Sequence, residues 1–540
     1  ELDNQVKSAK KNKKTWTDEV TDKMEDAARS GNQKELFHLV KEVTGKSNTG
    51  IPTIKGDDGE ILKDPEKVKE QWTRYFKELL NRPPPQRRLH RSGPIGEGLD
   101  LCEEPPTRDE VEKAIRKLKN NKASGLDGIA AELMKYGPTE MISKLHQLII
   151  RIWEREEVPE DWTRSLICPI YKKGDKSLCS NYRGISLLSV PGKVFGHILL
   201  DRMRDAVDKK LRENQGGFRR GRGCVDQIFC LRTLMEKCIE YQLPAFAIFV
   251  DFKAAFDSVH RPSMWHILQD YGIPDKFIRL IRAVYQDCEA AVLVENEKTD
   301  WFRIETGVRQ GCVWSPLLFG VLIDFVLRKA CDQNRYGICI RERKRTLFGT
   351  DKGLLLPDLD YADDVTLLET SDNHGNRLLN SVARAGGEVG LSVSVPKTKG
   401  MGIGDTTGAV QLEGQQLDTE DHFRMLGSTV MSNGRLDEEV KIRIGRASAA
   451  FGQLSKVWRS RVSLRTKLRI YNAVVISTLL YAAETWATTQ TEEKRLDAFD
   501  TKCLRRILNV KWFHRVRNTE IRARTEQQPV SLLLKRSRLR

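Results

Sequence analysis

One apolar run restricts the fold more than any other feature of the sequence. Residues 245–252 read AFAIFVDF, a continuous apolar and aromatic stretch that closes on Asp251 and Phe252. A run of this kind is typical of a strand that is buried on both faces, so it predicts a central strand in a sheet covered by helices. Asp251 would then stand at the end of that strand.

A second segment places two more acids at a turn. Residues 359–368 read LDYADDVTLL, with apolar arms on both sides of Asp363 and Asp364, which predicts a hairpin with carboxylates at its tip. Hard divalent cations prefer carboxylate oxygens, and nucleotidyl transfer uses two such cations about 3.5–4 Å apart. Asp251, Asp363 and Asp364 are therefore candidate metal ligands. The alternative interpretation of the adjacent pair is an ordinary solvated turn.

The positive charge is concentrated at the C-terminal end. The formal net charge is +16, and residues 441–540 alone account for it, with 23 Lys or Arg against seven Asp or Glu. This distribution favours a C-terminal element that binds a phosphate backbone over a merely solvated basic tail.

The remaining sequence predicts several folded units. The length of 540 residues exceeds one ordinary domain. Residues 15–45 predict one or two amphipathic helices, residues 82–106 a linker, and residues 165–171 a short strand, while Thr107 and Glu110 predict a helix-capping box. The cysteines show no metal-binding or disulfide spacing, and no apolar stretch is long enough for a membrane helix. Because the first residue is Glu, we expect a segment of a longer polypeptide.

Eight blocks resemble, in order, the reverse transcriptases of non-long-terminal-repeat (LINE-type) retrotransposons whose polyprotein pairs an endonuclease with the polymerase. They lie between about residues 100 and 435, and they read KLKNNKASGLDGI, CSNYRGISLLS, ENQGGFRRGRGCVDQIF, FVDFKAAFDSVHR, TGVRQGCVWSPLLFGVLID, LDYADDVTLL, SVPKTKGM and FRMLGSTV. The resemblance implies an α/β (α+β) right-hand polymerase with an antiparallel palm sheet. The expected parts are an N-terminal helical extension (1–81), a linker (82–107), fingers (108–240), a palm (241–435) and a basic helical thumb (436–540) truncated at its C-terminal end.

The resemblance also implies roles at the reaction centre. The metal ligands fall on Asp251, Asp363 and Asp364, with a backbone carbonyl from Phe252. Phe256 falls where an aromatic ring excludes a ribose 2′-hydroxyl, which predicts deoxynucleotide substrates. A plain core position is the alternative for Phe256.

Further residues of the blocks match positions around the substrates. Arg183 corresponds to a contact of the incoming triphosphate, with Lys172 and then Lys173 as second choices or surface charges. Gln310 and Gly311 correspond to the segment under the nascent base pair. Lys397 corresponds to the residue that protonates pyrophosphate, with Lys399 as the alternative. Template and primer contacts are expected at Arg219, Arg220, Arg222, Leu426 and Gly427.

The function implied is RNA-directed DNA synthesis with magnesium, or manganese in its place, from deoxynucleoside triphosphates on an RNA template and a DNA primer. Target-primed insertion would occur in the nucleus, with a cytoplasmic ribonucleoprotein before it. Three alternatives are a group II intron or retron reverse transcriptase, an RNA-copying RNA polymerase, which Phe256 disfavours, and a decayed nucleic-acid-binding protein. Trp314, Gly216, Arg220 and Ser124 depart from the family pattern, and none of them is a metal ligand.

Overall fold

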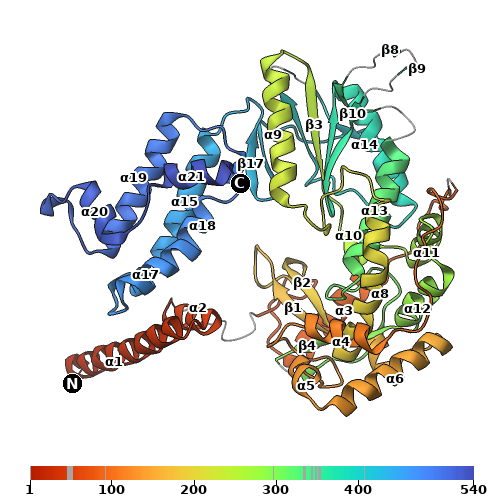
Figure 1. Cartoon of the computed structure of the whole chain (residues 1–540), viewed down its shortest axis with the longest axis horizontal. Coiled ribbons are helices and arrows are strands. Elements are labelled where there is room, and N and C mark those ends of the chain that lie inside the picture. The colour runs from red at the N-terminus through yellow and green to blue at the C-terminus, as the bar shows by residue number, and fades with distance from the viewer. Residues whose placement is uncertain are drawn as a thin grey trace. The chain divides into compact units, whose positions relative to one another are not determined.

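The structure is a computed structural model that divides into two compact units of mixed helix and sheet (Figure 1). It describes residues 2–44, 53–91, 93–295, 297–331, 336–341, 345–346, 349–350, 354–404, 406 and 408–539. The central unit comprises residues 51–227 and 241–420, and the terminal unit comprises 1–50, 228–240 and 421–540. Both ends of the chain thus belong to one unit.

A four-stranded antiparallel sheet forms the centre of the central unit. Its strands, in spatial order, are β11 (Asp358–Tyr361), β12 (Asp364–Glu369), β3 (Ala245–Val250) and β13 (Lys399–Ile403). Every residue of β3 is buried, which confirms the predicted central strand. The strand ends at Val250 rather than 252, because the backbone of Asp251 leaves the ladder and bonds with Thr398 and Ser394 instead.

A second sheet of the central unit contains the predicted strand at 165–171. It is built from β1 (Arg164–Tyr171), β2 (Tyr182–Leu187), β4 (Glu289–Val294), β5 (Glu297–Lys298) and β6 (Phe302–Arg303). β1 and β2 form an antiparallel hairpin, while β1 pairs with β4 in parallel. Short two-stranded pairs are β7 (Ile338–Arg341) with β10 (Leu354–Leu356), β8 (Arg345–Thr346) with β9 (Gly349–Thr350), and β14 (Gln411–Leu412) with β15 (Gln415–Gln416).

Helices cover both sheets and share one hydrophobic core with them. They are α3 (Pro65–Leu80), α4 (Arg108–Lys117), α5 (Ala131–Tyr136), α6 (Thr139–Arg155), α7 (Glu160–Thr163), η1 (Cys179–Asn181), α8 (Val190–Asp208), α10 (Ala255–Ser258), α11 (Arg261–Asp270), α12 (Asp275–Tyr285), α13 (Ser315–Cys331) and α14 (Asp372–Gly387). The Thr107–Glu110 capping box is present at the start of α4, as predicted.

The segment predicted as a linker is tied to the central unit. The backbone N–H of Ile95 donates to the carbonyl of Asp270, and that of Leu99 donates to the carbonyl of Gly272. The guanidinium of Arg91 also pairs with the Asp270 carboxylate. The described residues of this segment, 82–91 and 93–106, contain no helix or strand, but these bonds hold parts of it against α11 and the turn after it.

The terminal unit is helical apart from one hairpin, in agreement with the helical pattern predicted beyond residue 435. Its elements are α1 (Leu2–Arg29), α2 (Gln33–Thr44), most of α9 (Cys224–Glu240), β16 (His422–Met425), β17 (Ser428–Met431), α15 (Asp437–Gln453), α16 (Ser455–Arg459), α17 (Leu464–Ile470), η2 (Tyr471–Ile476), α18 (Ser477–Leu479), η3 (Ala483–Thr485), α19 (Gln490–Ile507), η4 (Trp512–His514), α20 (Asn518–Thr525) and α21 (Val530–Arg538).

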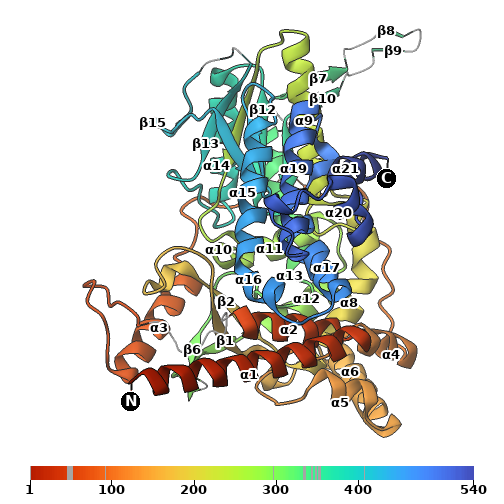
Figure 2. The same cartoon turned by 90° about the vertical axis from the view of Figure 1, so that its left-hand side faces the viewer.

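The segment at 15–45, predicted as one or two helices, belongs to α1 and α2, and α1 begins earlier, at Leu2. Both helices pack on the C-terminal ones (Figure 2), with which they share one hydrophobic core. Buried residues of α2, such as Leu36 and Val40, share that core with Val457 of α16. The ammonium of Lys456 donates to the carbonyl of Val43 at 2.9 Å, and the Arg469 guanidinium donates to the carbonyl of Ala28 at 3.0 Å. No helix among the described residues is long and apolar enough to cross a membrane.

Candidate active site

The sheet register brings the three predicted metal ligands together. Val250 of β3 pairs with Val365 of β12, so Asp251 and Asp364, the next residues along these antiparallel strands, occupy neighbouring positions where the β3–β12 pairing ends. Asp363 precedes Asp364 in the turn between β11 and β12, where Ala362 has φ of 58°. Asp251, which lies more than 100 residues before the adjacent Asp363 and Asp364 in sequence, thus meets them at one end of the sheet.

The carboxylates at this end of the sheet act on one another electrostatically. Desolvation raises the pKa of the Asp364 carboxyl to about 6, and the negative charges of Asp363 and Asp251 contribute in the same direction. Burial also raises the pKa of Asp363, where Asp251 again contributes, while Arg183 and Lys172 act in the opposite direction. Burial and like charge both disfavour ionised carboxylates, so this end of the sheet carries negative charge that a cation would stabilise.

The carboxylates fit a divalent cation by the chemistry of their oxygens. Burial, and after it the charge of neighbouring carboxylates, raises the pKa values of Asp363 and Asp364, and a bound hard cation would stabilise their ionised forms. Among the described residues, no three Asp, Glu, His or Cys side chains already converge as a ligand set. Phe252, the predicted carbonyl ligand, has a buried side chain and a backbone bridge to Val393.

Two lysines of the SVPKTKGM block differ in their partners. The Lys397 ammonium lies 3.1 Å from Oδ1 of Asp251. Lys399 instead pairs with Asp418 and with Glu420, the latter at 3.4 Å. The geometry therefore favours Lys397 over Lys399 as the lysine of the site.

The β1–β2 hairpin carries cations toward the acids. Arg183 stands opposite Ile170 in the hairpin, and its side chain is exposed. Its positive charge acts on both Asp363 and Asp257. Lys172 follows β1 and acts on Asp363 and Asp364, while burial and the charge of Arg183 lower its own pKa. Lys173 is exposed beside it. The predicted triphosphate contacts and the acids are thus electrostatic neighbours.

Phe256 is held by other aromatic rings. Its ring stacks on Phe319 of α13, with centroids 4.2 Å apart and planes 17° apart, and meets Phe218 edge-on at 6.2 Å. The side chain is only partly buried, and it lies five residues after Asp251. A ring fixed in this way presents a rigid apolar surface, which a steric filter for the sugar requires.

Sequence reasoning missed Asp257, which holds the predicted residue Gln310. The amide nitrogen of Gln310 lies 2.9 Å from each carboxylate oxygen of Asp257. Burial raises the pKa of Asp257 to about 6, although the bond from Gln310 and the charges of Arg82 and Arg183 lower it. The sequence signal that could have identified Asp257 is its position directly after Phe256.

Gly311 lies where a side chain would not fit. Its φ is 117°, and a Cβ there would stand 2.7 Å from the carbonyl oxygen of Ser186 in β2. The neighbouring backbone is also bonded, because the N–H of Ser186 donates to the carbonyl of Gln310 at 2.8 Å. The GVRQG segment therefore runs directly beside the β1–β2 hairpin.

The arginines of the GGFRRGRG segment have different environments. Arg219 is buried, and its guanidinium donates to the Asp208 carboxylate at 2.6 Å and to the carbonyls of Arg212 and Gln215. Arg222 pairs with Glu213. Arg220 is exposed. A template contact at Arg219 conflicts with this burial, because its donors already have protein acceptors; Arg220 is the most accessible of the three.

The FRMLGSTV block forms a hairpin in the terminal unit, as predicted. Leu426 and Gly427 connect β16 to β17 with φ of 47° and 88°, which suits a tight two-residue turn. The hydroxyl of Tyr481 donates to the carbonyl of Leu426 at 2.8 Å, and Arg443 donates to the carbonyl of Gly427. The contact of this turn with a primer stays a prediction.

Gln215 is a second residue that sequence reasoning missed, although it lies within the ENQGGFRRGRG block. Its side chain is buried, and Oε1 accepts the backbone N–H of Ala362 at 2.9 Å and that of Gly217 at 2.6 Å. A Cβ on Gly217 would stand 2.2 Å from the nitrogen of Ala362, so glycine permits this approach. Gln215 therefore secures the turn that precedes Asp363.

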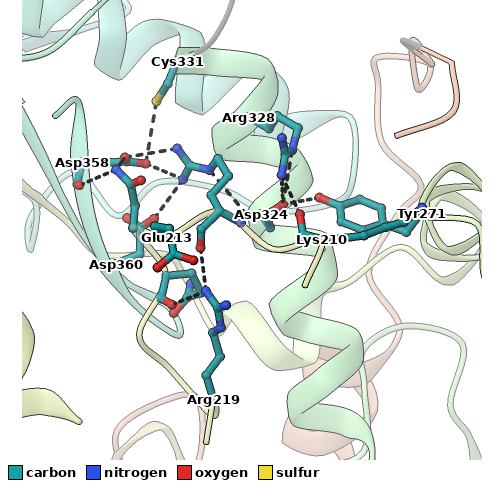
Figure 3. A network of polar contacts seen from close by, with 12 residues as sticks. Lys210, Glu213, Arg219, Tyr271, Asp324, Arg328, Cys331, Asp358 and Asp360 are labelled. Atoms are coloured by element: carbon teal, nitrogen blue, oxygen red, sulfur yellow. Dashed lines mark hydrogen bonds and ion pairs between the residues drawn. The ribbon is translucent and has the colours of Figure 1, made fainter. Parts of the chain in front are cut away.

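A second set of acids is buried around Arg212, on β11 and α13 (Figure 3). Asp358 and Asp360 of β11 and Asp324 of α13 have fully buried side chains and form a network with neighbouring residues. Arg212 lies 2.5 Å from Asp358, 3.0 Å from Asp360 and 3.5 Å from Asp324. Burial lowers the pKa of Arg212, but the charges of Asp358 and Asp360 outweigh it and raise that pKa well above its ordinary value.

Comparison with known proteins agrees with the site. Residues 170–430 match the family model described as reverse transcriptase (RNA-dependent DNA polymerase). These residues include the three acids, β2 and the turn between β16 and β17. The matched segment is therefore a reverse transcriptase domain.

Curated relatives specify the kind of element. An uncharacterized 149 kDa protein of transposon TX1 from Xenopus laevis is 26% identical over 348 residues, which cover 62% of this chain and 25% of that protein. The RNA-directed DNA polymerase from mobile element jockey of Drosophila funebris is 24% identical over 444 residues, 78% of this chain and 46% of that protein. The putative 115 kDa protein in retrotransposable element R1DM of Drosophila melanogaster is 27% identical over 404 residues, 72% and 37% respectively.

The chain thus contains a reverse transcriptase domain, and it is similar over most of its length to proteins of non-long-terminal-repeat (LINE-type) retrotransposons. It spans between a quarter and about half of the length of these curated relatives.

Proposed function

We propose that this chain copies an RNA template into DNA by adding deoxynucleotides to the 3′-end of a DNA primer. The observation that carries the proposal is the register of β3 with β12, which sets Asp251 beside Asp363 and Asp364. The match of residues 170–430 to the reverse transcriptase family supports the same reaction.

The acids at the end of the sheet would hold the metal ions. Asp251, Asp363 and Asp364 would hold two magnesium ions, or manganese in their place, with the Phe252 carbonyl as a further ligand. When bound, these ions lower the pKa of the primer hydroxyl and neutralise the triphosphate. Asp363 and Asp364 must be ionised for this, and both have raised pKa values, that of Asp364 to about 6, so cation binding should weaken as the solution becomes acidic.

Basic side chains and the groups near them would orient the nucleotide. Arg183 and Lys172 would bind triphosphate oxygens, because both act electrostatically on Asp363. Lys397 would donate a proton to pyrophosphate after it exchanges its present partner, Asp251. Asp257 fixes the Gln310 amide, and Phe256 would exclude a 2′-hydroxyl.

A right-hand arrangement follows from the proposal. The four-stranded sheet would be the palm, the β1–β2 sheet with its helices the fingers, and the helices from α15 onward the thumb. From the resemblance to this family, the proposed setting is target-primed insertion in the nucleus, after assembly of a cytoplasmic ribonucleoprotein.

Primer extension tests the activity. The parent chain and Asp363→Ala are compared on RNA and DNA templates of one sequence, with deoxynucleotides or ribonucleotides. We expect magnesium-dependent deoxynucleotide addition on RNA by the parent and none by the variant. Template binding without extension by the parent would support the decayed, binding-only alternative.

Sugar selection is tested separately with Phe256→Ala. Loss of the ring should admit ribonucleotides, and Phe256→Tyr should retain the parent's selectivity because it keeps the ring. Unchanged discrimination in Phe256→Ala would remove the role given to this residue.

A further inference from the structure

Seven of the 23 Lys and Arg residues at 441–540 line one groove of the terminal unit. Its walls come from α16, α19, α20 and the loop between the last two. The lining includes seven cations and no acid, and we call it the cationic groove: Arg459, Lys502, Arg505, Arg506, Lys511, Arg515 and Arg517. Six of the seven, all except Arg505, are exposed.

The carboxylates on these helices interact with residues that do not line the groove. Asp500 accepts from the hydroxyl of Tyr471 at 2.6 Å and pairs with Arg522 at 2.5 Å. Asp497 accepts from the Ser531 hydroxyl at 2.7 Å, and Glu520 pairs with Arg524. Within the described part of the chain, no ion pair joins a carboxylate to a cation of the groove. The positive charge of the groove is therefore left for an external anion.

Aromatic side chains stand at the rim of this groove. Trp512, which lines the groove, is 87% exposed, and its neighbour Phe513 is 53% exposed. The two rings meet edge-on with centroids 5.8 Å apart, and Phe513 meets His514 in the same way at 4.7 Å. Burying such large apolar surfaces in a partner would be favourable, so their exposure marks a binding surface.

The loop that presents Trp512 is held in place. The guanidinium of Arg505 donates to the carbonyl of Val516 at 2.6 Å and to the side chain of Asn518 at 2.8 Å. The N–H of Val510 also donates to the carbonyl of Arg505 at 2.8 Å. Trp458, at the groove, is buried and stacks on Phe451 with centroids 5.0 Å apart. A fixed loop loses little conformational entropy when a ligand binds.

We propose that the cationic groove binds a single-stranded segment of RNA, with phosphates on its Lys and Arg side chains and an unpaired base stacked on Trp512. Phosphate-binding cations interleaved with exposed aromatic rings are the combination that single strands require, because the bases of a duplex are already stacked on each other. The choice of RNA rests on the proposed function, in which the template is the strand that remains unpaired.

Equilibrium binding of the full chain to a labelled 12-nucleotide RNA, followed by fluorescence anisotropy, tests the proposal. We expect Trp512→Ala to raise Kd by about five- to hundredfold, the range of one lost base stack, and Trp512→Phe to raise it by less than about threefold. Lys502→Ala with Arg515→Ala should reduce the slope of log Kd against log salt by about 1.4, which corresponds to two phosphate contacts.

The matched control is Lys494→Ala with Arg495→Ala, two exposed cations on α19 that do not line the groove. It should shift Kd and the salt slope far less than the groove pair. An effect of equal size in both pairs, or an unchanged Kd in Trp512→Ala, would overturn the proposal.

Two further ligands decide the class of nucleic acid. A duplex RNA of the same length should bind without dependence on Trp512, and single-stranded DNA should bind more weakly than RNA. Equal dependence on Trp512 for the duplex refutes base stacking, and equal affinity for DNA refutes the choice of RNA. The binding measurement needs no deoxynucleoside triphosphates, so a chain that fails to extend primers can still confirm RNA binding in the groove. Asp363→Ala should bind RNA like the parent.

Discussion

Two sets of carboxylates lie on the β11–β12 hairpin and differ in how their charge is compensated. Asp358 and Asp360 point into the protein, where Arg212 lies within 3.0 Å of both. Asp363 and Asp364 lie at the turn, where Arg183 and Lys172 act on Asp363 from another sheet. A buried acid with its own arginine fixes structure, while a group of acids that repel one another is suited to bind a cation. Residue type alone would not separate the two sets.

The largest effect on stability is expected at the buried set. Arg212→Met would leave Asp358, Asp360 and Asp324 without their shared cation, at a cost of about 3–5 kcal/mol for an uncompensated buried charge. Thermal and urea unfolding would measure it. Arg220→Met, on the exposed loop nearby, is the control and should leave the unfolding midpoint unchanged. Similar midpoints in both variants would mean that the network does not hold the hairpin.

The opposite result is expected at the candidate metal ligands. Asp251→Asn keeps the size of the side chain but removes its charge, so primer extension should fall by about 10²–10³-fold, the scale at which one electrostatic partner of a transition state acts. Stability should change by less than about 1 kcal/mol, because the substitution weakens the exposed ion pair with Lys397 but also removes repulsion with Asp363 and Asp364. Unfolding curves measured beside extension rates would expose a merely structural role if both declined together.

Gln215 links the two sets, and its loss should produce an intermediate effect. Gln215→Ala leaves the buried N–H groups of Ala362 and Gly217 without their acceptor, which costs about 1–3 kcal/mol. Because Ala362 precedes Asp363, kcat should fall and the magnesium concentration for half-maximal rate should rise, with little change in the nucleotide KM. A lower unfolding midpoint with an unchanged magnesium requirement would limit Gln215 to stability.

The smallest effect concerns pH. The folded-state pKa of Asp364 is raised to about 6, above its ordinary value of 3.8. Its ionisation therefore costs stability as pH rises through that interval, and Asp364→Asn should be more stable than the parent at pH 8 but not at pH 3. The side chain still reaches solvent, so less than about 1 kcal/mol is expected. Calorimetry at the two pH values would measure it, and a gain at pH 3 alone would contradict the assignment.

The sequence predicted the parts of the site that depend on local pattern. The apolar run at β3 and the apolar arms of the β11–β12 hairpin are long enough to define strands, and their acids fall where the strands end. The family resemblance added the residues that surround them. The strand end at Val250 differed because Thr398 and Ser394 offer Asp251 local hydrogen bonds.

Other features depend on partners that sequence pattern does not reveal. Arg219, in a glycine-rich segment, was predicted to contact a template, but Asp208, eleven residues earlier, binds it inside the protein. Asp257 and Gln215 act through hydrogen bonds with residues 53 and 147 positions away in the sequence. The concentration of charge beyond residue 440 was visible in the sequence, but the groove that seven of these cations line without an acid became apparent only from the arrangement of the helices.

The shared core of the first and last helices has a consequence for how the protein reaches its native state. Val20, Met24 and Leu36 contribute to the same core as Val457 and Leu504, although more than 400 residues separate them. A ribosome makes α1 and α2 before the helices at 441–540, and the apolar sides of α1 and α2 must remain uncovered until those later residues have left the exit tunnel. The terminal unit would thus fold only after residues 441–540 have been made, and its nascent helices are a natural target for chaperones during that interval.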